Sequence, residues 1–202
     1  MNNKTLHKYP PIILASQSPR RKALLSALGV PFKAVSIAFD ERFDLNDVKM
    51  DDVPEYLACQ KAEAASHLLT SDNILITSDT LVLLGDSIMG KPIDKQDAFD
   101  MLCQLSGRSS MVTTGVCICS QSKKISFSSS THIEFSSMSN HEIQYYIDQY
   151  NPLDKAGAYG IQEWIGMAFI RKISGCYNNV VGLPTELVYK KLKSFIGIEM
   201  TE

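Results

Sequence analysis

A strand-to-helix junction near the start of the sequence constrains the fold more than any other feature. The apolar run of residues 11–16 (PIILAS) predicts a short buried strand. A helix is expected to follow at once, because Ser18 is a preferred N-cap, Pro19 is favoured at the first helical position and Gly29 is a common stop. A buried strand that leads directly into a helix is typical of α/β proteins.

The rest of the chain repeats this alternation of strand and helix patterns. Strands are expected at residues 30–39, 73–84, 88–92, 110–119, 124–137 and 167–173, and helices at residues 54–69, 94–105, 140–150 and 184–196. The sequence contains no internal repeat and no long linker. The pattern therefore predicts a single α/β domain over residues 1–202, in which residues 1–10 form a loose extension.

Composition narrows the class of protein. The chain has 202 residues, enough for a sizeable core, and its net charge of −2 excludes the basic excess of a sequence-indifferent nucleic-acid binder. Its five cysteines lack the spacing of a zinc site and are expected to be reduced thiols. No apolar run approaches the length of a transmembrane helix. We therefore expect a soluble cytoplasmic protein that binds neither nucleic acid nor membrane.

Positive charge at the start of the first expected helix points to an anionic ligand. Arg20, Arg21 and Lys22 fall in its first turn, where cations oppose the helix dipole. Backbone N–H groups at a helix start, serine hydroxyls and guanidinium groups together can hold phosphate oxygens. The acidic run that follows, residues 40–55, suits a metal ion beside such a phosphate. Solvated surface charge explains the same residues, so both interpretations stay open.

Lys61 is a charged residue on an apolar helix stripe. The stripe of the helix expected at residues 54–69 also contains Leu57, Ala65 and Leu68. A lysine in this position either extends its ammonium to water past an apolar stem or points it at a carboxylate or phosphate. The sequence leaves both open.

Asp79 lies near the end of an apolar strand, a common place for a catalytic carboxylate. The turn at residues 85–86 predicts a hairpin, and counting back from it places Thr80 opposite Lys91. Asp79 and Lys91 would then be diagonal neighbours. An ordinary surface ion pair would give the same pattern.

The segment 154–162 (DKAGAYGIQ) has the composition of a binding loop. Gly157 and Gly160 allow a sharp turn and a close approach of the backbone. Tyr159 offers a stacking face, and the Gln162 amide can both donate and accept at the edge of a base. A purely structural loop is the alternative.

Together these segments resemble the Maf family of nucleoside triphosphate pyrophosphatases, also called septum-formation-inhibitor-like proteins. The resemblance covers nearly the whole chain, and the motifs follow the family's order: SxSPRR after the first strand, then Glu41, LACQKA with Lys61, SDT with Asp79, GKP with Lys91, and DKAGAYGIQ. It implies an elongated α/β fold similar to inosine triphosphate pyrophosphatase, with a mixed sheet, flanking helices and two lobes around a cleft.

The resemblance also implies an activity and residue roles. The activity is hydrolysis of a nucleoside triphosphate to the monophosphate and pyrophosphate with a divalent cation, Mg²⁺ or Mn²⁺, and relatives suggest a homodimer. Asp79 matches the family's proton acceptor. The specificity positions are matched by Arg20, Thr80 and Gln162, and other cleft positions by Ser16, Arg21, Glu41, Lys61 and Lys91. Glu41 and Asp79 are the candidate metal ligands.

The combination of SPRR with DKAGAYGIQ resembles the branch that acts on dTTP and UTP, with removal of modified pyrimidine nucleotides as an associated role. Two residues depart from the family's pattern. Ser78 replaces a common alanine, and Glu163 replaces the frequent glycine of IQG. Glu163 would strain the turn if its position has a positive φ, and its carboxylate beside Gln162 could alter base selection. The alternative functions are 7-methyl-GTP hydrolysis and nucleotide-dependent regulation of cell division with little catalysis.

Overall fold

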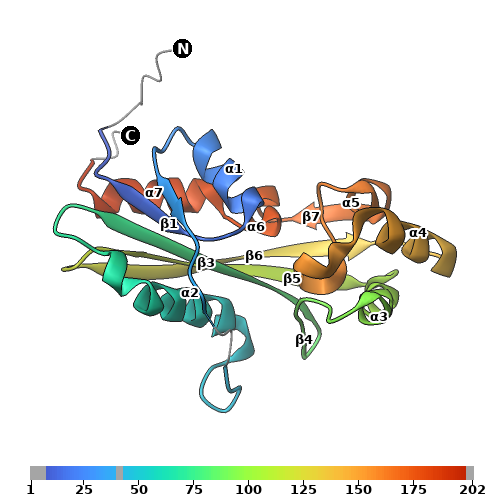
Figure 1. The fold of residues 1–202 in the computed structure, drawn as a ribbon. Coiled ribbons are helices and arrows are strands. Elements are labelled where there is room, and N and C mark those ends of the chain that lie inside the picture. Colours follow the sequence, from blue (N-terminus) through green and yellow to red (C-terminus); the bar gives the residue numbers. More distant parts are fainter. Residues whose placement is uncertain (1–7, 40–42, 199–202) are drawn as a thin grey trace. The chain divides into compact units, whose positions relative to one another are not determined.

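The computed structural model describes residues 8–39 and 43–198 (Figure 1). Its strands are β1 (Ile12–Ala15), β2 (Lys33–Val35), β3 (Ile74–Leu84), β4 (Ser87–Met89), β5 (Ser109–Cys119), β6 (Lys124–Phe135) and β7 (Ile170–Ser174). Its α-helices are α1 (Pro19–Ala27), α2 (Val53–Ala64), α3 (Lys95–Leu105), α4 (Asn140–Tyr150), α5 (Trp164–Phe169), α6 (Tyr177–Val181) and α7 (Thr185–Phe195). Short 3-10 helices are η1 (Met50–Asp52), η2 (Ser66–Leu68), η3 (Pro152–Asp154) and η4 (Ala156–Ala158).

The strands of the described residues form one mixed sheet. Its order is β2-β1-β3-β5-β6-β7, and β4 pairs with β3 off this path. β1 is parallel to both β2 and β3, whereas β3–β4 and β6–β7 are antiparallel. The prediction of an α/β fold with a mixed sheet and flanking helices is therefore confirmed.

The chain divides into two compact units. The first unit comprises Met1–Asp79, Thr114–Ser129 and Gly182–Glu202, and the second comprises Thr80–Thr113 and Ser130–Val181. The single domain over residues 1–202 and the cleft between lobes stay predictions. Of the loose extension expected at residues 1–10, residues 1–7 lie outside the described part of the chain.

In the first unit, alternate strand residues face different helices. One face packs against α1 and α7 through Ile12, Leu14, Ile74, Ile76, Val116, Ile118, Leu25, Val188 and Leu192. The other face packs against α2 through Ala15, Leu75, Cys117, Cys119, Ala58 and Ala62. Figure 1 shows α2 on one side of these strands and α1 and α7 on the other. Both faces are apolar because helices cover both.

The strand-to-helix junction forms as predicted. The Ser18 side chain caps α1 by accepting a hydrogen bond from the Arg21 backbone N–H at 3.3 Å, and Pro19 opens the helix. Gly29, with a φ of 70°, ends this segment in the left-handed region that glycine tolerates best.

Three predicted elements differ from the structure. The strand expected at residues 30–39 is reduced to β2, and the helix expected at residues 54–69 stops at Ala64 before η2. The strand expected at residues 167–173 begins only at Ile170, because α5 precedes it. Short helices such as α5 and α6 depend on tertiary contacts more than on a sequence pattern. No described helix combines the length and the apolar character needed to cross a lipid bilayer.

The predicted hairpin forms, but it is shorter than the count implies. Leu84 pairs with Ser87 as expected, and Gly85 in the turn has a φ of 60°. The described ladder ends where Val82 pairs with Met89. Lys91 lies beyond it, and its placement opposite Thr80 stays a prediction. The Gly90 carbonyl accepts a hydrogen bond from the Gly157 N–H at 3.0 Å, which joins the end of the hairpin to the loop over residues 154–162.

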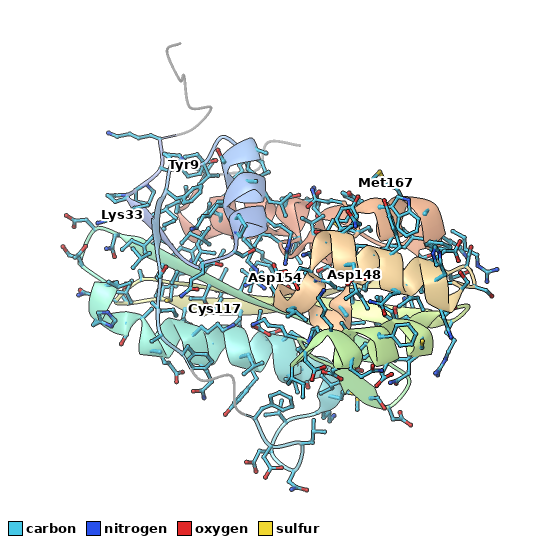
Figure 2. All side chains as sticks on the ribbon, turned by 45° about the vertical axis from the view of Figure 1, so that its right-hand side comes forward. Tyr9, Lys33, Cys117, Asp148, Asp154 and Met167 are labelled. Atoms are coloured by element: carbon cyan, nitrogen blue, oxygen red, sulfur yellow. The ribbon has the colours of Figure 1, made fainter. Side chains whose placement is uncertain are left out.

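In the second unit, α3 packs against α4. Lys95 Nζ lies 2.9 Å from Asp148 Oδ1, which links the two helices at the exposed surface. Asp148 is labelled in Figure 2. Ser139 and Glu142 form a capping box at the start of α4, and this matches the helix predicted at residues 140–150.

Cys59 is expected to be a more reactive thiol than Cys103. The Cys117 thiol (Figure 2), followed by Ser126 and the Lys124 charge, lowers the pKa of Cys59 to about 6. Burial raises the pKa of Cys103 instead. At pH 7 iodoacetamide should therefore alkylate Cys59 at least about ten times faster than Cys103, because the thiolate is the nucleophile. Peptide mass spectrometry over a time course from pH 5 to pH 9 measures both rates, and equal rates at pH 7 would contradict the expectation.

Candidate functional site

Two serine hydroxyls organise the start of α1. Ser16 is buried at the end of β1, and its Oγ accepts a hydrogen bond from the Ser18 N–H at 3.2 Å. The Ser18 hydroxyl in turn caps the helix. Both hydroxyls therefore shape the turn that presents the cations of α1, and the contact of Ser16 with a ligand stays a prediction.

Arg21 ties this turn to two other segments of the first unit. Its Nε donates to the Gly182 carbonyl at 2.9 Å, and its Nη1 donates to the Ser78 carbonyl at 2.7 Å. The Ser78 hydroxyl donates to the same Gly182 carbonyl at 3.3 Å. Arg21 thus fixes the backbone one residue before Asp79, a role that the sequence did not indicate. Arg20 lies half-buried on the same turn.

Lys61 and Asp79 are brought together by the face of β3 that meets α2. Thr77 Oγ1 donates to the Ala58 carbonyl at 2.6 Å, which fixes the strand against the helix. Asp79 lies two residues further along β3, and Lys61 lies one helical turn beyond Ala58. The Lys61 ammonium consequently donates to Asp79 Oδ1. The open question about Lys61 is settled in favour of a carboxylate partner.

This ion pair is almost completely buried. The side chains of Lys61 and Asp79 are 11% and 7% exposed. The Phe39 ring lies against the lysine, with its centroid 5.8 Å from Nζ. Breaking such a pair strands one charge in a poorly solvated place, so each residue depends on the other. Lys61 is therefore a cation beside Asp79. The placement of Lys91 as a diagonal neighbour of Asp79 stays a prediction.

The predicted metal ligands are described only in part. Glu41 lies outside the described residues. Within residues 8–39 and 43–198, no group of three His, Cys, Asp or Glu side chains could hold a metal ion by itself. Asp79 remains as one buried carboxylate. One carboxylate fits a Mg²⁺ ion that takes its other ligands from phosphate oxygens and water.

Three of the predicted residues belong to the second unit. Thr80 follows Asp79 directly on β3, and Lys91 is an exposed residue just after β4. Gln162 is exposed, although its neighbour Ile161 is buried. The Gln162 amide makes no hydrogen bond with the described part of the chain, so it is available to a ligand.

The loop before Gln162 has a constrained backbone. Gly157 has a φ of 68°, and a Cβ added to it would lie 3.1 Å from a methyl carbon of Val82. Ala158 is fully buried with a φ of 59°, a region that residues with a side chain rarely adopt. Tyr159 is buried edge-on against Phe135, with ring centroids 5.1 Å apart. The expectation that Tyr159 offers a stacking face is therefore wrong.

Glu163 sits in the loop without strain. Its φ of −96° and ψ of 174° are ordinary extended values, so the expected strain is absent. Glu163 Oε2 accepts a hydrogen bond from the Tyr146 hydroxyl, and Oε1 lies 3.1 Å from Lys155 Nζ. Tyr146 and Lys155 were not predicted from the sequence as residues that support this loop. The available signal was that Tyr146 shares the buried stripe of α4 with Ile143, where a tyrosine hydroxyl needs a partner.

Comparison with known proteins gives consistent matches over most of the chain. The family model described as "Maf-like protein" matches residues 11–195. A dTTP/UTP pyrophosphatase of Phocaeicola vulgatus is 46% identical over 190 residues, which are 94% of this chain and 98% of the relative. A dTTP/UTP pyrophosphatase of Porphyromonas gingivalis is 46% identical over 195 residues, which are 94% of this chain and 96% of the relative. Among solved structures, the Ham1 protein of Staphylococcus aureus matches with a TM-score of 0.44 and 13% identity, over 62% of this chain and 72% of that chain.

Proposed function

The chain belongs to the Maf family, and from this premise we propose that it hydrolyses nucleoside triphosphates, in particular dTTP and UTP, to the monophosphate and pyrophosphate. The relatives at 46% identity are named for dTTP and UTP. The observation that carries the proposal is the buried ion pair of Lys61 and Asp79, which fixes the position of the Asp79 carboxylate. The same unit contains the cationic start of α1.

In the proposed reaction, water cleaves the bond between the α- and β-phosphates. Asp79 orients this water and accepts its proton, a task that requires a carboxylate held in position. Lys61 and Arg21 hold it there, one through the side chain and the other through the preceding carbonyl. Negative charge develops on the departing pyrophosphate, and the cationic side chains that stabilise it are those of Arg20, Arg21, Lys61 and Lys91.

Base recognition is assigned to Gln162 together with Arg20 and Thr80. The exposed Gln162 amide can donate and accept at the edge of a pyrimidine. Recognition of a pyrimidine edge would extend to modified pyrimidine nucleotides, whose removal is part of the proposal. Nothing in the described residues favours 7-methyl-GTP hydrolysis or regulation without catalysis.

A divalent cation, Mg²⁺ or Mn²⁺, belongs to the same proposal. Asp79, and Glu41 outside the described residues, are the side chains that would hold it beside the phosphate oxygens. The cation would neutralise charge on those oxygens.

A cytoplasmic location and a homodimeric assembly are also part of the proposal. All five cysteines are free thiols, which is typical of the reducing cytoplasm. The homodimer and the lack of nucleic-acid partners stay predictions, which gel filtration and a nucleic-acid binding assay would test.

Pyrophosphate release from a panel of nucleotides tests the proposed function. We expect release from dTTP, UTP and 5-methyl-UTP at least about tenfold faster than from CTP, GTP and 7-methyl-GTP, because only the first three present the N3–H donor and O4 acceptor of the uracil or thymine edge that Gln162 would read. Each nucleotide is assayed with Mg²⁺, with Mn²⁺ and with a chelator, which should abolish release. Binding without release from any nucleotide would contradict the enzymatic proposal and favour sensing.

A further inference from the structure

A hydrogen-bonded network fastens the loop that ends in Gln162 to α4. The Tyr146 hydroxyl of α4 accepts a hydrogen bond from the Gly160 N–H at 3.0 Å and donates one to Glu163 Oε2. The other oxygen of Glu163 lies 3.1 Å from Lys155 Nζ. The Glu163 backbone N–H closes the turn by donating to the Gly160 carbonyl at 3.0 Å. Glu163 thus takes part in three of these four contacts.

The buried groups of this network depend on one another for their hydrogen-bond and ion-pair partners. The Lys155 side chain is 8% exposed, and its carboxylate partners are the exposed Asp154 and Glu163, which is 24% exposed. Burial and the Glu163 carboxylate raise the pKa of Tyr146, so its hydroxyl stays protonated and remains the donor. Loss of the Glu163 carboxylate leaves the buried Lys155 ammonium and the buried Tyr146 hydroxyl with fewer partners, which raises the free energy of the folded loop.

The Gln162 amide has no support of its own. It forms no hydrogen bond within the described residues, so the backbone on either side decides where it lies. On the amino side that backbone includes Ala158, held in an unfavourable region of φ. Such a conformation persists only where the surrounding contacts over-determine it.

We propose that Glu163 is a positioning residue for base selection: by joining Tyr146 and Lys155 to the loop, it fixes the backbone that presents the Gln162 amide to the pyrimidine. The inference rests on the proposed function and deepens it. Glu163 does not itself read the base, because Tyr146 and Lys155 already engage both of its carboxylate oxygens.

The test compares KM and kcat for UTP, dTTP and CTP in Glu163→Ala, Glu163→Gln and Gln162→Ala. Glu163→Ala should raise KM for UTP and dTTP about tenfold and reduce the preference for UTP over CTP, with kcat changed less than about threefold. Glu163→Gln keeps an oxygen for the Tyr146 hydroxyl and should restore much of the preference. In the double variant Glu163→Ala/Gln162→Ala, the loss of the preference for UTP over CTP should be much smaller than the sum of the losses in the two single variants, because both act through the Gln162 amide.

Two further variants separate positioning from general destabilisation. An added Cβ at Gly160 would lie 2.7 Å from Glu163 Cδ and 2.8 Å from its Oε2, so Gly160→Ala displaces the carboxylate without removing it and should reproduce the loss of preference. Thr131→Val is the matched control, because it breaks another buried network of the second unit, in which Thr131 Oγ1 binds the Cys176 and Asn179 groups. It should lower the melting temperature and leave the UTP-to-CTP ratio unchanged.

The outcomes are distinguishable. A wild-type enzyme that turns over UTP while Glu163→Ala keeps its KM and its preference overturns the positioning role alone. Equal loss of preference in Glu163→Gln and Glu163→Ala overturns it in favour of direct contact with the base. A wild-type protein that neither binds nor hydrolyses any nucleotide overturns both the positioning role and the proposed function.

Discussion

Replacing Asp79 by asparagine is expected to reduce pyrophosphate release by about 10²–10⁴-fold, the range that a positioned general base contributes. Asparagine keeps the size of the side chain but cannot accept the proton of the attacking water. The triphosphate should still bind, because the proposed phosphate contacts come from cationic side chains that the substitution leaves in place. Initial rates with dTTP, together with calorimetric binding of a non-hydrolysable dTTP analogue, measure the two effects separately.

The substitution also breaks the buried pair with Lys61, so loss of folding must be separated from loss of chemistry. Removing the carboxylate charge from this buried ion pair is expected to cost about 3–5 kcal/mol of stability. The double variant Lys61→Met/Asp79→Asn removes both charges and should recover much of that stability while remaining inactive. Asp72→Asn, at an exposed position just before β3, is the matched control and should retain full activity. A near-normal rate in Asp79→Asn would show that another group accepts the proton.

Gly115→Ala should be strongly destabilising although it adds only one methyl group. A Cβ at Gly115 on β5 would overlap with the backbone of Pro54 and Glu55 at the start of α2. Backbone atoms cannot rotate out of the way, so the helix itself must shift, at a cost of about 3 kcal/mol or more. Because α2 carries Lys61, turnover should fall as well.

Urea unfolding of Gly115→Ala measures this cost, and Gly90→Ala provides the comparison. An added Cβ at Gly90 meets no atom within 4 Å, so its effect should stay within about 0.5 kcal/mol. If both variants unfolded at the wild-type urea concentration, the close approach of α2 to β5 would be contradicted.

Local sequence patterns predicted the elements whose causes are themselves local. Ser18 and Pro19 define the start of α1 within a few residues, and the turn at residues 85–86 fixes the pairing of Leu84 with Ser87. These features follow from capping and turn preferences that act over two to four positions. The alternation of strand and helix patterns was likewise enough for the fold class.

The contacts that build the candidate site could not be predicted in the same way. Arg21 binds the carbonyl of Gly182, far along the chain, and nothing near either residue indicates the other. Lys61 was recognised as unusual, yet its partner Asp79 follows only from the packing of α2 on β3. Strain at Glu163 was expected only if its φ were positive, and its φ of −96° and its contact with α4 follow from the folded structure alone. In each case the partner is chosen by three-dimensional packing, which outweighs local preference.

The division of the chain has a consequence for its synthesis. The first unit is built from three separated stretches, and all of the second unit is encoded between the first and the last of them. During translation the ribosome therefore releases the residues of the second unit before α7 and the Gly182 carbonyl can join the first. Until then, the Arg21 guanidinium and the Ser78 hydroxyl lack the acceptor that they share in the folded chain. A nascent chain stalled before residue 182 therefore carries every proposed site residue, but it lacks the carbonyl that anchors the Arg21 guanidinium and the Ser78 hydroxyl next to Asp79.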